Sequence, residues 1–358
     1  MKLGLLVAGG GGLQVADMVA LAERAEESGY DGVFVPESLR SGVATVAAIA
    51  AATDRVEVGP YVLNAHARTP LSAGMEAIDL DQLSQGRLVL GVGSGNAVMN
   101  ESGHGVPVVR PLGKMRDYLE VLRQVTTAPA GTCVSYDGER HHVKNWRAQA
   151  TLVRDSLPTL LAATSPRMMD LAADLAGGIA LGPLQSASFV SVIAERLRAR
   201  SPLGQGFAVY CAAFVAVDPD RAIARASARR AVVNLFAVKP HPHYERLLRL
   251  QGHSEFIDQL MHRLATTGGE GAEGEVPDEV VDDLTIAGTA EECAARIEQY
   301  SPSVNMLILQ NVAALEQITP RHHVNPARLV ASYGGLLDLA SLRRPLPETG
   351  EAIILRST

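Results

Sequence analysis

Short apolar runs alternate with helix-period segments from the first residues of this chain onward. The first four apolar runs predict strands over Leu3–Ala8, Gly32–Pro36, Val56–Leu63 and Arg87–Val92. The segments between them space their apolar residues as one face of a helix does, over Val15–Ser28, Val43–Ala52 and Leu71–Leu83. Successive strands that are joined by helices run parallel, because each helix returns the chain to the end of the sheet at which the previous strand began. The alternation therefore predicts a parallel sheet wrapped by helices.

The alternation continues through the second half of the chain. It predicts four more strands, over Leu157–Ala163, Gly178–Leu181, Phe207–Val217 and Val304–Gln310. It also predicts helices over Lys114–Thr126, Pro166–Leu175, Ser188–Arg200, Ala290–Tyr300 and Pro326–Leu342. Eight strands in this order predict an α/β fold of the (β/α)8 TIM-barrel type. The alternative, an open doubly wound sheet, would need a GxGxxG turn after the first strand, which Gly9–Gly12 resembles only superficially.

Two segments interrupt the pattern and predict excursions from a single barrel domain over residues 1–342. They cover residues 128–157 and the helix-rich residues 218–303. Within the second, the polar and glycine-rich run Thr266–Pro277 predicts a mobile loop or lid. Residues 343–358 are expected to form a C-terminal tail over the surface.

Composition excludes several classes of function. Apolar residues make up 47% of the chain, charged residues 20%, and the formal net charge is −7. No block of Lys and Arg is long enough to follow a phosphate backbone, so nucleic-acid binding is not expected. No run approaches 18 apolar residues, so no membrane span is expected. The dispersed cysteines Cys133, Cys211 and Cys293 form no CxxC pair, which favours a reducing, cytoplasmic location.

The functional residues of a barrel lie where its strands end at the carboxyl side. These positions hold Gly9–Gly12, Glu37 and Ser38, Asn64 to His66, Ser94 to Asn96, Thr164 and Ser165, Gly182, and Gln310. The set is rich in amides, hydroxyls and glycines and poor in charge. It has no carboxylate pair for glycoside hydrolysis, no metal-ligand spacing and no GxSxG elbow. The histidines at 141–142, 241–243 and 322–323 lie away from strand ends and are expected at the surface. A polar, uncharged mouth favours a flat heterocyclic cofactor that performs redox chemistry itself.

Two turns at this mouth have local features of a ligand site. Gly93 and Gly95 would let a planar ligand lie against bare backbone, although an ordinary strand-to-helix turn has the same pattern. Ala163, Thr164 and Ser165 precede Pro166 at a helix start, where free backbone N–H groups suit a phosphate. The alternative for Ser165 is a simple helix N-cap.

Four segments together resemble the bacterial luciferase-like superfamily of flavin and deazaflavin oxidoreductases. They are LDQLSQGRLVLGVGSG (80–95), VSYDGERHHV (134–143), SPRMMDLAADLAGGIAL (165–181) and LTIAGTAEECAARIEQY (284–300). The second resembles a hairpin of the family. All four stand in the order of the family and span most of the chain. The resemblance implies a (β/α)8 barrel with an isoalloxazine-type ring across its mouth.

The resemblance also implies a set of cofactor contacts. It implies a non-proline cis peptide near Tyr61–Val62 at the end of the third strand, and it places Ser94, Asn96 and Asn100 toward the ring or its ribityl chain. Asn64, at the end of the same strand, is a further candidate for cofactor binding. Ala163, Thr164 and Ser165 would hold the phosphate, with Gly182 nearby.

The segment GSGNAVMNE (93–101) resembles a turn of the sugar-phosphate dehydrogenases that use the deazaflavin coenzyme F420. It departs from that turn because Asn96 stands in place of an acid and one residue is inserted before Asn100. Pro36-Glu37-Ser38 also replaces the Asp-His pair of those enzymes, so a sugar-phosphate substrate is not implied. The candidate catalytic residues are therefore Glu37, His66 and Asn96, with Glu37 or His66 as the acid. The alternatives are an ion-paired or helix-start carboxylate for Glu37 and an exposed loop residue for His66.

Three hypotheses of function follow from these residues and the resemblance. The first is an F420-dependent oxidoreductase that transfers hydride to or from a small organic substrate. The second is an FMN-dependent monooxygenase that uses oxygen and takes reduced flavin from a separate reductase. The third is a non-catalytic luciferase-like barrel. The resemblance further implies a homodimer, and no metal site is expected.

Overall fold

The computed structural model describes residues 1–8, 12–38, 40–237, 242–269, 271–313 and 326–342 of the 358-residue chain. The predictions made for residues 9–11, for His241, for the histidine pair at 322–323 and for the tail 343–358 lie outside these ranges.

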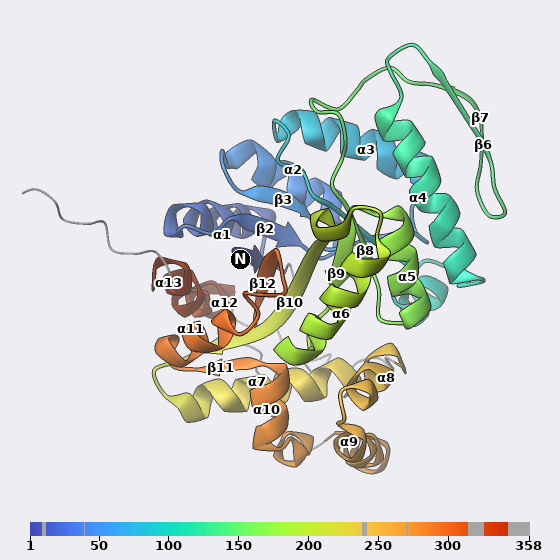
Figure 1. Cartoon of the computed structure of the whole chain (residues 1–358). Coiled ribbons are helices and arrows are strands. Elements are labelled where there is room, and N and C mark those ends of the chain that lie inside the picture. Colours follow the sequence, from blue (N-terminus) through green and yellow to red (C-terminus); the bar gives the residue numbers. More distant parts are fainter. Residues whose placement is uncertain (9–11, 39, 238–241, 270, 314–325, 343–358) are drawn as a thin grey trace, which may run out of the picture.

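The strands form one parallel barrel sheet and one separate hairpin (Figure 1). The sheet contains β1 (Lys2–Leu6), β2 (Gly32–Val35), β3 (Glu57–Pro60), β4 (Leu63–Asn64), β5 (Leu90–Gly93), β8 (Thr159–Ala162), β9 (Gly178–Leu181), β10 (Ala208–Val217), β11 (Ile286–Gly288) and β12 (Met306–Asn311). Their order is β3-β2-β1-β12-β10-β9-β8-β5-β4, and β11 pairs with β10 outside this path. Since β3 and β4 are two parts of one strand position, the described residues form an eight-position barrel. This confirms the predicted (β/α)8 architecture.

The ring closes between the third and fourth strand positions. Leu63 and Asn64 of β4 pair with Val92 and Gly93 of β5, and Val58 forms a parallel bridge with Leu88. Gly59 permits this approach, because a Cβ atom there would lie 1.8 Å from the carbonyl oxygen of Val89. The predicted strand Val56–Leu63 is therefore interrupted, and the interruption contains a cis peptide bond at Tyr61–Val62, as the resemblance implied.

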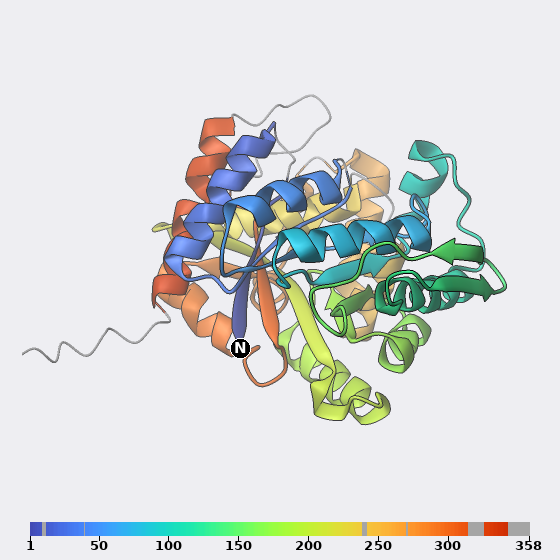
Figure 2. The same cartoon turned by 90° about the horizontal axis from the view of Figure 1, so that it is seen from above.

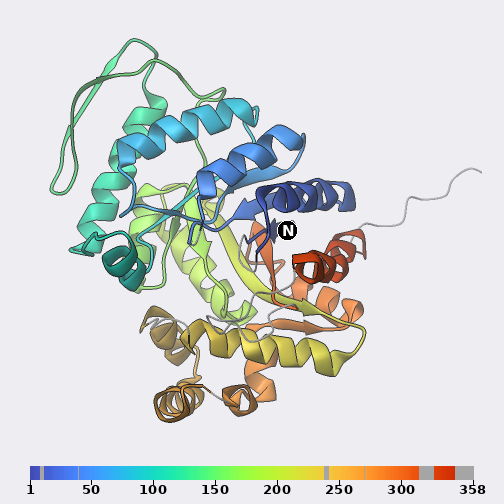
Figure 3. The same cartoon turned by 180° about the vertical axis from the view of Figure 1, so that it is seen from behind.

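Helices surround the barrel as a ring, seen from behind in Figure 3. The ring contains α1 (Val15–Ser28), α2 (Gly42–Ala52), α3 (Pro70–Leu83), α4 (Pro111–Thr127), α5 (Pro166–Leu175), α6 (Ala187–Arg200), α11 (Ala290–Glu298), α12 (Pro326–Ser332) and α13 (Gly334–Leu342). Capping residues define several helix ends. The side chains of Ser41 and Thr69 accept hydrogen bonds from backbone N–H groups at the starts of α2 and α3. Gly29, with φ 95°, ends α1. The single C-terminal helix predicted over Pro326–Leu342 is instead divided at Tyr333.

Side chains fill the barrel interior below the mouth. Leu6, Phe34, Tyr210, Met306 and neighbouring apolar residues form one buried cluster there. Phe34 makes edge contacts with Tyr61 and Tyr210 at centroid distances of 5.9 and 6.0 Å. A larger cluster lies between the strands and the helix ring. Because the interior is packed, a ligand site belongs at the mouth.

The first excursion is a hairpin of β6 (Cys133–Asp137) and β7 (His142–Arg147), which matches the hairpin that the resemblance implied. It lies on the outer side of α4, as Figures 1 and 2 both show. Val134 and Ala148 of this excursion pack against Val121 and Val125 of α4.

The second excursion has its own apolar core. It consists of α7 (Arg221–Ala237), α8 (Pro242–Leu250), α9 (Ser254–Thr267) and α10 (Asp278–Leu284). The described residues also contain the short helices η1 (Met99–Gly103), η2 (Gly204–Gly206) and η3 (Ala272–Glu275). The prediction of a loop or lid over Thr266–Pro277 is wrong for Thr266, Thr267 and Ala272–Glu275, which are helical. Helix α9 extends to Thr267, and the apolar side chains of Ala272 and Val276 are buried in this second core.

No helix within the described ranges is long and apolar enough to cross a lipid bilayer.

Candidate functional site

Each predicted site residue lies at or just beyond the carboxyl end of a barrel strand. Glu37 follows β2, Tyr61 to His66 surround β4, and Ser94 to Asn100 follow β5. Ala163 to Ser165 follow β8, and Gly182 follows β9. Since all these strands are parallel, the residues lie around one mouth.

Two buried amides connect the turn after β4 to the turn after β5. The side chain of Asn64 donates to the Asn100 side-chain oxygen at 2.6 Å, and the Asn100 side chain donates to the Ser94 carbonyl at 2.8 Å. Asn64 also accepts from the backbone N–H of His66 at 3.0 Å. Both amides are buried, Asn100 completely. Their geometry assigns them to holding Ser94 and His66 in place.

The glycines of the β5 turn are close to protein side chains, which revises their expected role. A Cβ atom on Gly93 would lie 2.9 Å from Val62, and one on Gly95 would lie 2.7 Å from the Asn64 side chain. Gly95 has φ +65°, which favours glycine. These glycines therefore make room for Val62 and Asn64, and through them they shape the mouth.

Asn96 acts as a helix cap. Its side-chain oxygen accepts the backbone N–H groups of Val98 and Met99 at 2.8 and 3.2 Å, at the start of the short helical segment that includes η1. This bonding resembles an ordinary N-cap. The amide that replaces an acid in the related turn is thus engaged in local structure.

Glu37 forms an ion pair, as its alternative interpretation proposed. Arg68 donates to its two carboxylate oxygens at 2.9 and 2.8 Å, and the Asn64 backbone N–H donates at 3.3 Å. Arg68 also contacts Glu76 of α3 at 2.7 Å. Because both oxygens of Glu37 accept hydrogen bonds from the 64–68 segment, Glu37 holds the loop that contains His66 in place.

His66 is buried, contrary to the alternative of an exposed loop residue. Only 5% of its surface is accessible, and neither ring nitrogen has a hydrogen-bond partner of normal geometry among the described residues. Burial lowers its pKa to about 4, Lys114 acts in the same direction, and the backbone of Ser94 acts in the opposite one. At neutral pH its imidazole is therefore uncharged and able to accept a proton.

Tyr61 and Val62 point to different parts of the barrel. The Tyr61 hydroxyl donates across the interior to the carbonyls of Leu181 at 2.7 Å and Tyr210 at 3.1 Å. Val62 packs beside Gly91 and Gly93 instead. Tyr61 thus contributes its backbone to the mouth, while Val62 also contributes its side chain.

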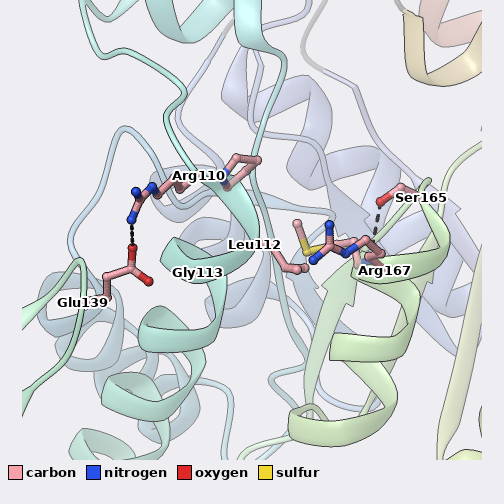
Figure 4. A pocket seen from close by; sticks show the side chains of 8 residues that line it. Arg110, Leu112, Gly113, Glu139, Ser165 and Arg167 are labelled. Carbon is pink, nitrogen blue, oxygen red and sulfur yellow. Dashed lines mark hydrogen bonds and ion pairs between the residues drawn. The ribbon is translucent and has the colours of Figure 1, made fainter.

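The turn after β8 borders a pocket of about 490 Å³ (Figure 4). Ser165 caps α5 by accepting the Met168 N–H at 3.4 Å, while Ala163 is buried and Thr164 half-buried. Figure 4 shows Arg110 paired with Glu139 on one side of the pocket and Arg167 beside Ser165 on the other. The lining residues are Arg110, Pro111, Leu112, Gly113, Glu139, Ser165, Arg167 and Met168.

Gly182 lies against Tyr244, a residue that sequence reasoning missed. A Cβ atom on Gly182 would lie 2.5 Å from the Tyr244 hydroxyl. Helix α8 of the second excursion therefore approaches the mouth closely, which no local sequence pattern indicated.

Sequence reasoning also missed Lys114 and Tyr118 of α4 and misjudged His141. The Nε2 atom of His141 is buried, and its ring meets the ring of Tyr118 edge-on at 5.8 Å. The prediction of a surface position is therefore wrong for His141, whereas His142 is exposed. The hairpin turn has brought His141 to the mouth.

Within the residues that the structure covers, no group of three or more His, Cys, Asp or Glu side chains is arranged to hold a metal ion.

The parallel barrel belongs to the TIM-barrel class. Its amide and hydroxyl side chains gather in the turns of one mouth, where the enzymes of this class have their active sites. A family model described as luciferase-like monooxygenase matches residues 3–304. The chain therefore belongs to the luciferase-like monooxygenase family and is an oxidoreductase, so the hypothesis of a non-catalytic barrel is set aside.

Proteins that resemble this chain in sequence or in fold differ in the cofactors that their names give. The chain is 28% identical to a 5,10-methylenetetrahydromethanopterin reductase of Archaeoglobus fulgidus, over 77% of this chain and 83% of the relative. The coenzyme F420 dependent tetrahydromethanopterin reductase of Methanopyrus kandleri has a similar fold, with a TM-score of 0.75, 20% identity and coverage of 93% and 97%. The oxygenating constituent of 3,6-diketocamphane monooxygenase of Pseudomonas putida, in complex with FMN, gives a TM-score of 0.62, 13% identity and coverage of 97% and 99%.

Proposed function

We propose that this protein is an F420-dependent oxidoreductase that transfers hydride to or from a small organic substrate. The observation that carries the proposal is a buried, uncharged His66 at an otherwise amide-lined mouth. Similarity to a reductase over 77% of the chain supports it. When bound, F420 supplies or accepts hydride at a carbon atom, so the protein needs to bind, orient and handle a proton.

The residues at the mouth suit such a cofactor. The ring would lie beside Val62 and Ser94, in the frame that Asn64 and Asn100 hold. The turn of Ala163, Thr164 and Ser165 at the start of α5 would hold the phosphate, with Gly182 nearby.

The pocket beside this turn favours F420 over FMN. The tail of F420 continues beyond its phosphate and is negatively charged, whereas FMN ends at the phosphate. Arg167 has no ion-pair partner among the described residues, and Arg110 is solvent-exposed and paired with Glu139. Two guanidinium groups around a pocket next to Ser165 suit an anionic tail.

His66 is the group that we assign to proton transfer. Its neutral imidazole would accept a proton from a substrate hydroxyl or amine during oxidation. In the reverse direction the same atom would return the proton. Glu37 supports this role by holding the 64–68 loop through Arg68 and the Asn64 backbone.

The second candidate is an FMN-dependent monooxygenase supplied by a separate reductase. Its support is the shared fold with an FMN-bound monooxygenase. We also propose a homodimer in a reducing, cytoplasmic location, for which the free thiols of Cys133, Cys211 and Cys293 are suited.

Titration of the purified protein with each cofactor tests the proposal. We expect F420 fluorescence to be quenched at micromolar concentrations and FMN to bind more weakly. Ser94→Trp should abolish F420 binding because its ring occupies the mouth, whereas Ser341→Trp on the exposed face of α13 should leave it unchanged. Tight binding of FMN without any binding of F420 would overturn the proposal in favour of the monooxygenase.

A further inference from the structure

Four polar side chains from three separate segments meet beside the mouth. His66 comes from the loop after β4, Lys114 and Tyr118 come from α4, and His141 comes from the hairpin turn. The rings of Tyr118 and His141 are 5.8 Å apart, and both Lys114 and His141 lie close enough to His66 to lower its pKa. We refer to these four residues as the polar cluster.

The polar cluster contains several buried atoms without partners. Within the described residues, neither the Tyr118 hydroxyl nor Nε2 of His141 has a hydrogen-bond partner, and the ring nitrogens of His66 have none of normal geometry, although the Ser94 backbone interacts with the ring closely enough to raise its pKa. Only 5% of the His66 surface is exposed, and Tyr118 is completely buried. Buried polar atoms are almost always hydrogen-bonded, and a group of exceptions indicates a missing ligand or water.

The charges that act on His66 are positive. Lys114 and Arg140 each lower the pKa of His66, and they also lower the pKa of His141. The Lys114 ammonium is half-buried and has no ion pair in the described part of the chain. Burial lowers its own pKa, and Arg140 adds to this effect.

The nearby carboxylates are engaged elsewhere. Asp117 accepts the Tyr136 hydroxyl and the backbone N–H groups of Arg140 and His141. On the α3 side of Tyr118, Glu37 and Glu76 share Arg68. Of the other titratable groups of the hairpin turn, Glu139 is paired with Arg110 and His142 is paired with Asp137, both at the surface. None of these carboxylates forms an ion pair with Lys114.

We propose that the polar cluster binds an anionic group of the substrate, a carboxylate or a phosphate, through Lys114, Tyr118 and His141. This inference rests on the proposed function and names the substrate class of the same mouth. Ammonium, hydroxyl and imidazole N–H groups are all donors that such oxygen atoms accept. The anion would offset the positive potential at His66 and raise its pKa, so that substrate binding would itself prepare His66 to donate a proton.

Inorganic phosphate and acetate, added to the cofactor-free protein, probe the site directly. NMR of the imidazole groups should show that phosphate shifts the His66 and His141 signals and raises the pKa of His66. Lys114→Met should weaken phosphate binding by about tenfold or more, because a charge-assisted bond is lost. Lys144→Met, at an exposed position of β7, should leave the affinity unchanged.

Equal phosphate affinity in the Lys114→Met and Lys144→Met variants would overturn the proposal, as would the absence of any shift at His66. If Lys114→Met fails to fold, Tyr118→Phe keeps the buried ring and removes only the hydroxyl, and it should weaken phosphate binding in the same assay. An unchanged affinity in Tyr118→Phe would then contradict the site.

Repetition of the titration with bound cofactor identifies the source of the anion. Retained phosphate binding supports a substrate group, whereas competitive loss would assign the cluster to the phosphate or tail of the cofactor and overturn our assignment. The cofactor-free measurement does not depend on which cofactor binds. A failure of F420 to bind would therefore be distinguishable from a failure of the anion site.

Discussion

His66 follows β4 at the barrel mouth, where Asn64 accepts its backbone N–H and Glu37 fixes the same loop through Arg68. Burial lowers its pKa from the ordinary value of 6.5 to about 4. Between these two values the unfolded chain binds a proton more readily than the folded protein does. Stability associated with His66 is therefore lost as the pH falls through this range.

Lowering the pH from about 7 to about 5 should reduce the free energy of unfolding by about 2 kcal/mol through His66 alone. Urea unfolding at the two pH values would measure the change. His66→Gln should remove most of this pH dependence, because glutamine does not titrate. His142→Gln, at the exposed hairpin position, should retain it. An equal pH dependence in His66→Gln and the native protein would show that folding does not lower the pKa of His66.

Individual residues at the mouth were predictable in position but less so in role. The strand-end rule predicted that Asn64, Ser94 and Asn96 lie at the mouth, and in the structure Asn64 ends β4 while the other two follow β5. It did not predict that Asn64 and Asn100 bond to each other. That contact joins residues 36 positions apart and depends on how two turns approach in space.

At the scale of elements, the β6–β7 hairpin is attached to α4 by one buried carboxylate as well as by apolar packing. Asp117 accepts from the Tyr136 hydroxyl at 3.0 Å and from the backbone N–H groups of Arg140 and His141. A carboxylate that accepts several hydrogen bonds stabilises the attachment more than a neutral acceptor would, because hydrogen bonds to a charged group are stronger. This attachment positions His141 beside Tyr118.

Asp117→Asn should loosen the hairpin turn while the barrel stays folded. The uncharged amide accepts more weakly and lacks one of the two acceptor oxygens, so hydrogen exchange at the amides of Arg140 and His141 should accelerate about tenfold. Hydrogen exchange followed by mass spectrometry or NMR measures this directly. The matched control is Asp137→Asn in the same hairpin, whose side chain is exposed and faces His142. Equal exchange rates in both variants would mean that apolar packing alone holds the turn.

The periodic elements were predictable, and the irregular ones were not. Helix α1 begins and ends at the predicted residues, since Gly29 terminates its apolar pattern. The run Thr266–Pro277 was misjudged because its glycines indicate a loop, yet Ala272 and Val276 are buried against α7 and α9. Tertiary burial outweighed the local composition there.

At the scale of the whole molecule, the second excursion is a helical unit with its own core that also contacts the mouth. Arg225 of α7 pairs with Asp278 and Asp282 of α10 at 2.7 and 2.6 Å, which holds these helices together. Tyr244 of α8 contacts Gly182 after β9. The excursion therefore forms part of the wall around the proposed phosphate turn.

Gly182→Ala should disturb this contact, because the new methyl group would lie 2.5 Å from the Tyr244 hydroxyl. We expect a loss of about 1–2 kcal/mol in unfolding free energy and weaker cofactor binding. Tyr244→Phe removes the clashing atom. Adding Gly182→Ala to the Tyr244→Phe variant should therefore cost much less unfolding free energy than adding it to the native protein. Thermal unfolding and cofactor titration of the four proteins form a double-mutant cycle. Additive effects would show that α8 does not restrict the mouth.

The sequence by itself determined the barrel and the mouth at which its candidate site lies. Alternating apolar periods specify parallel strands and outer helices, and parallel strands bring the polar turns that follow them to one mouth. Only the tertiary structure decided which of those side chains have partners. Val62 and Asn64 occupy the space that bare glycines leave, Arg68 engages Glu37, and α4 and the hairpin bring Lys114 and His141 to His66. These contacts join segments far apart in the chain, and burial and charge depend on such packing, which local periodicity does not encode.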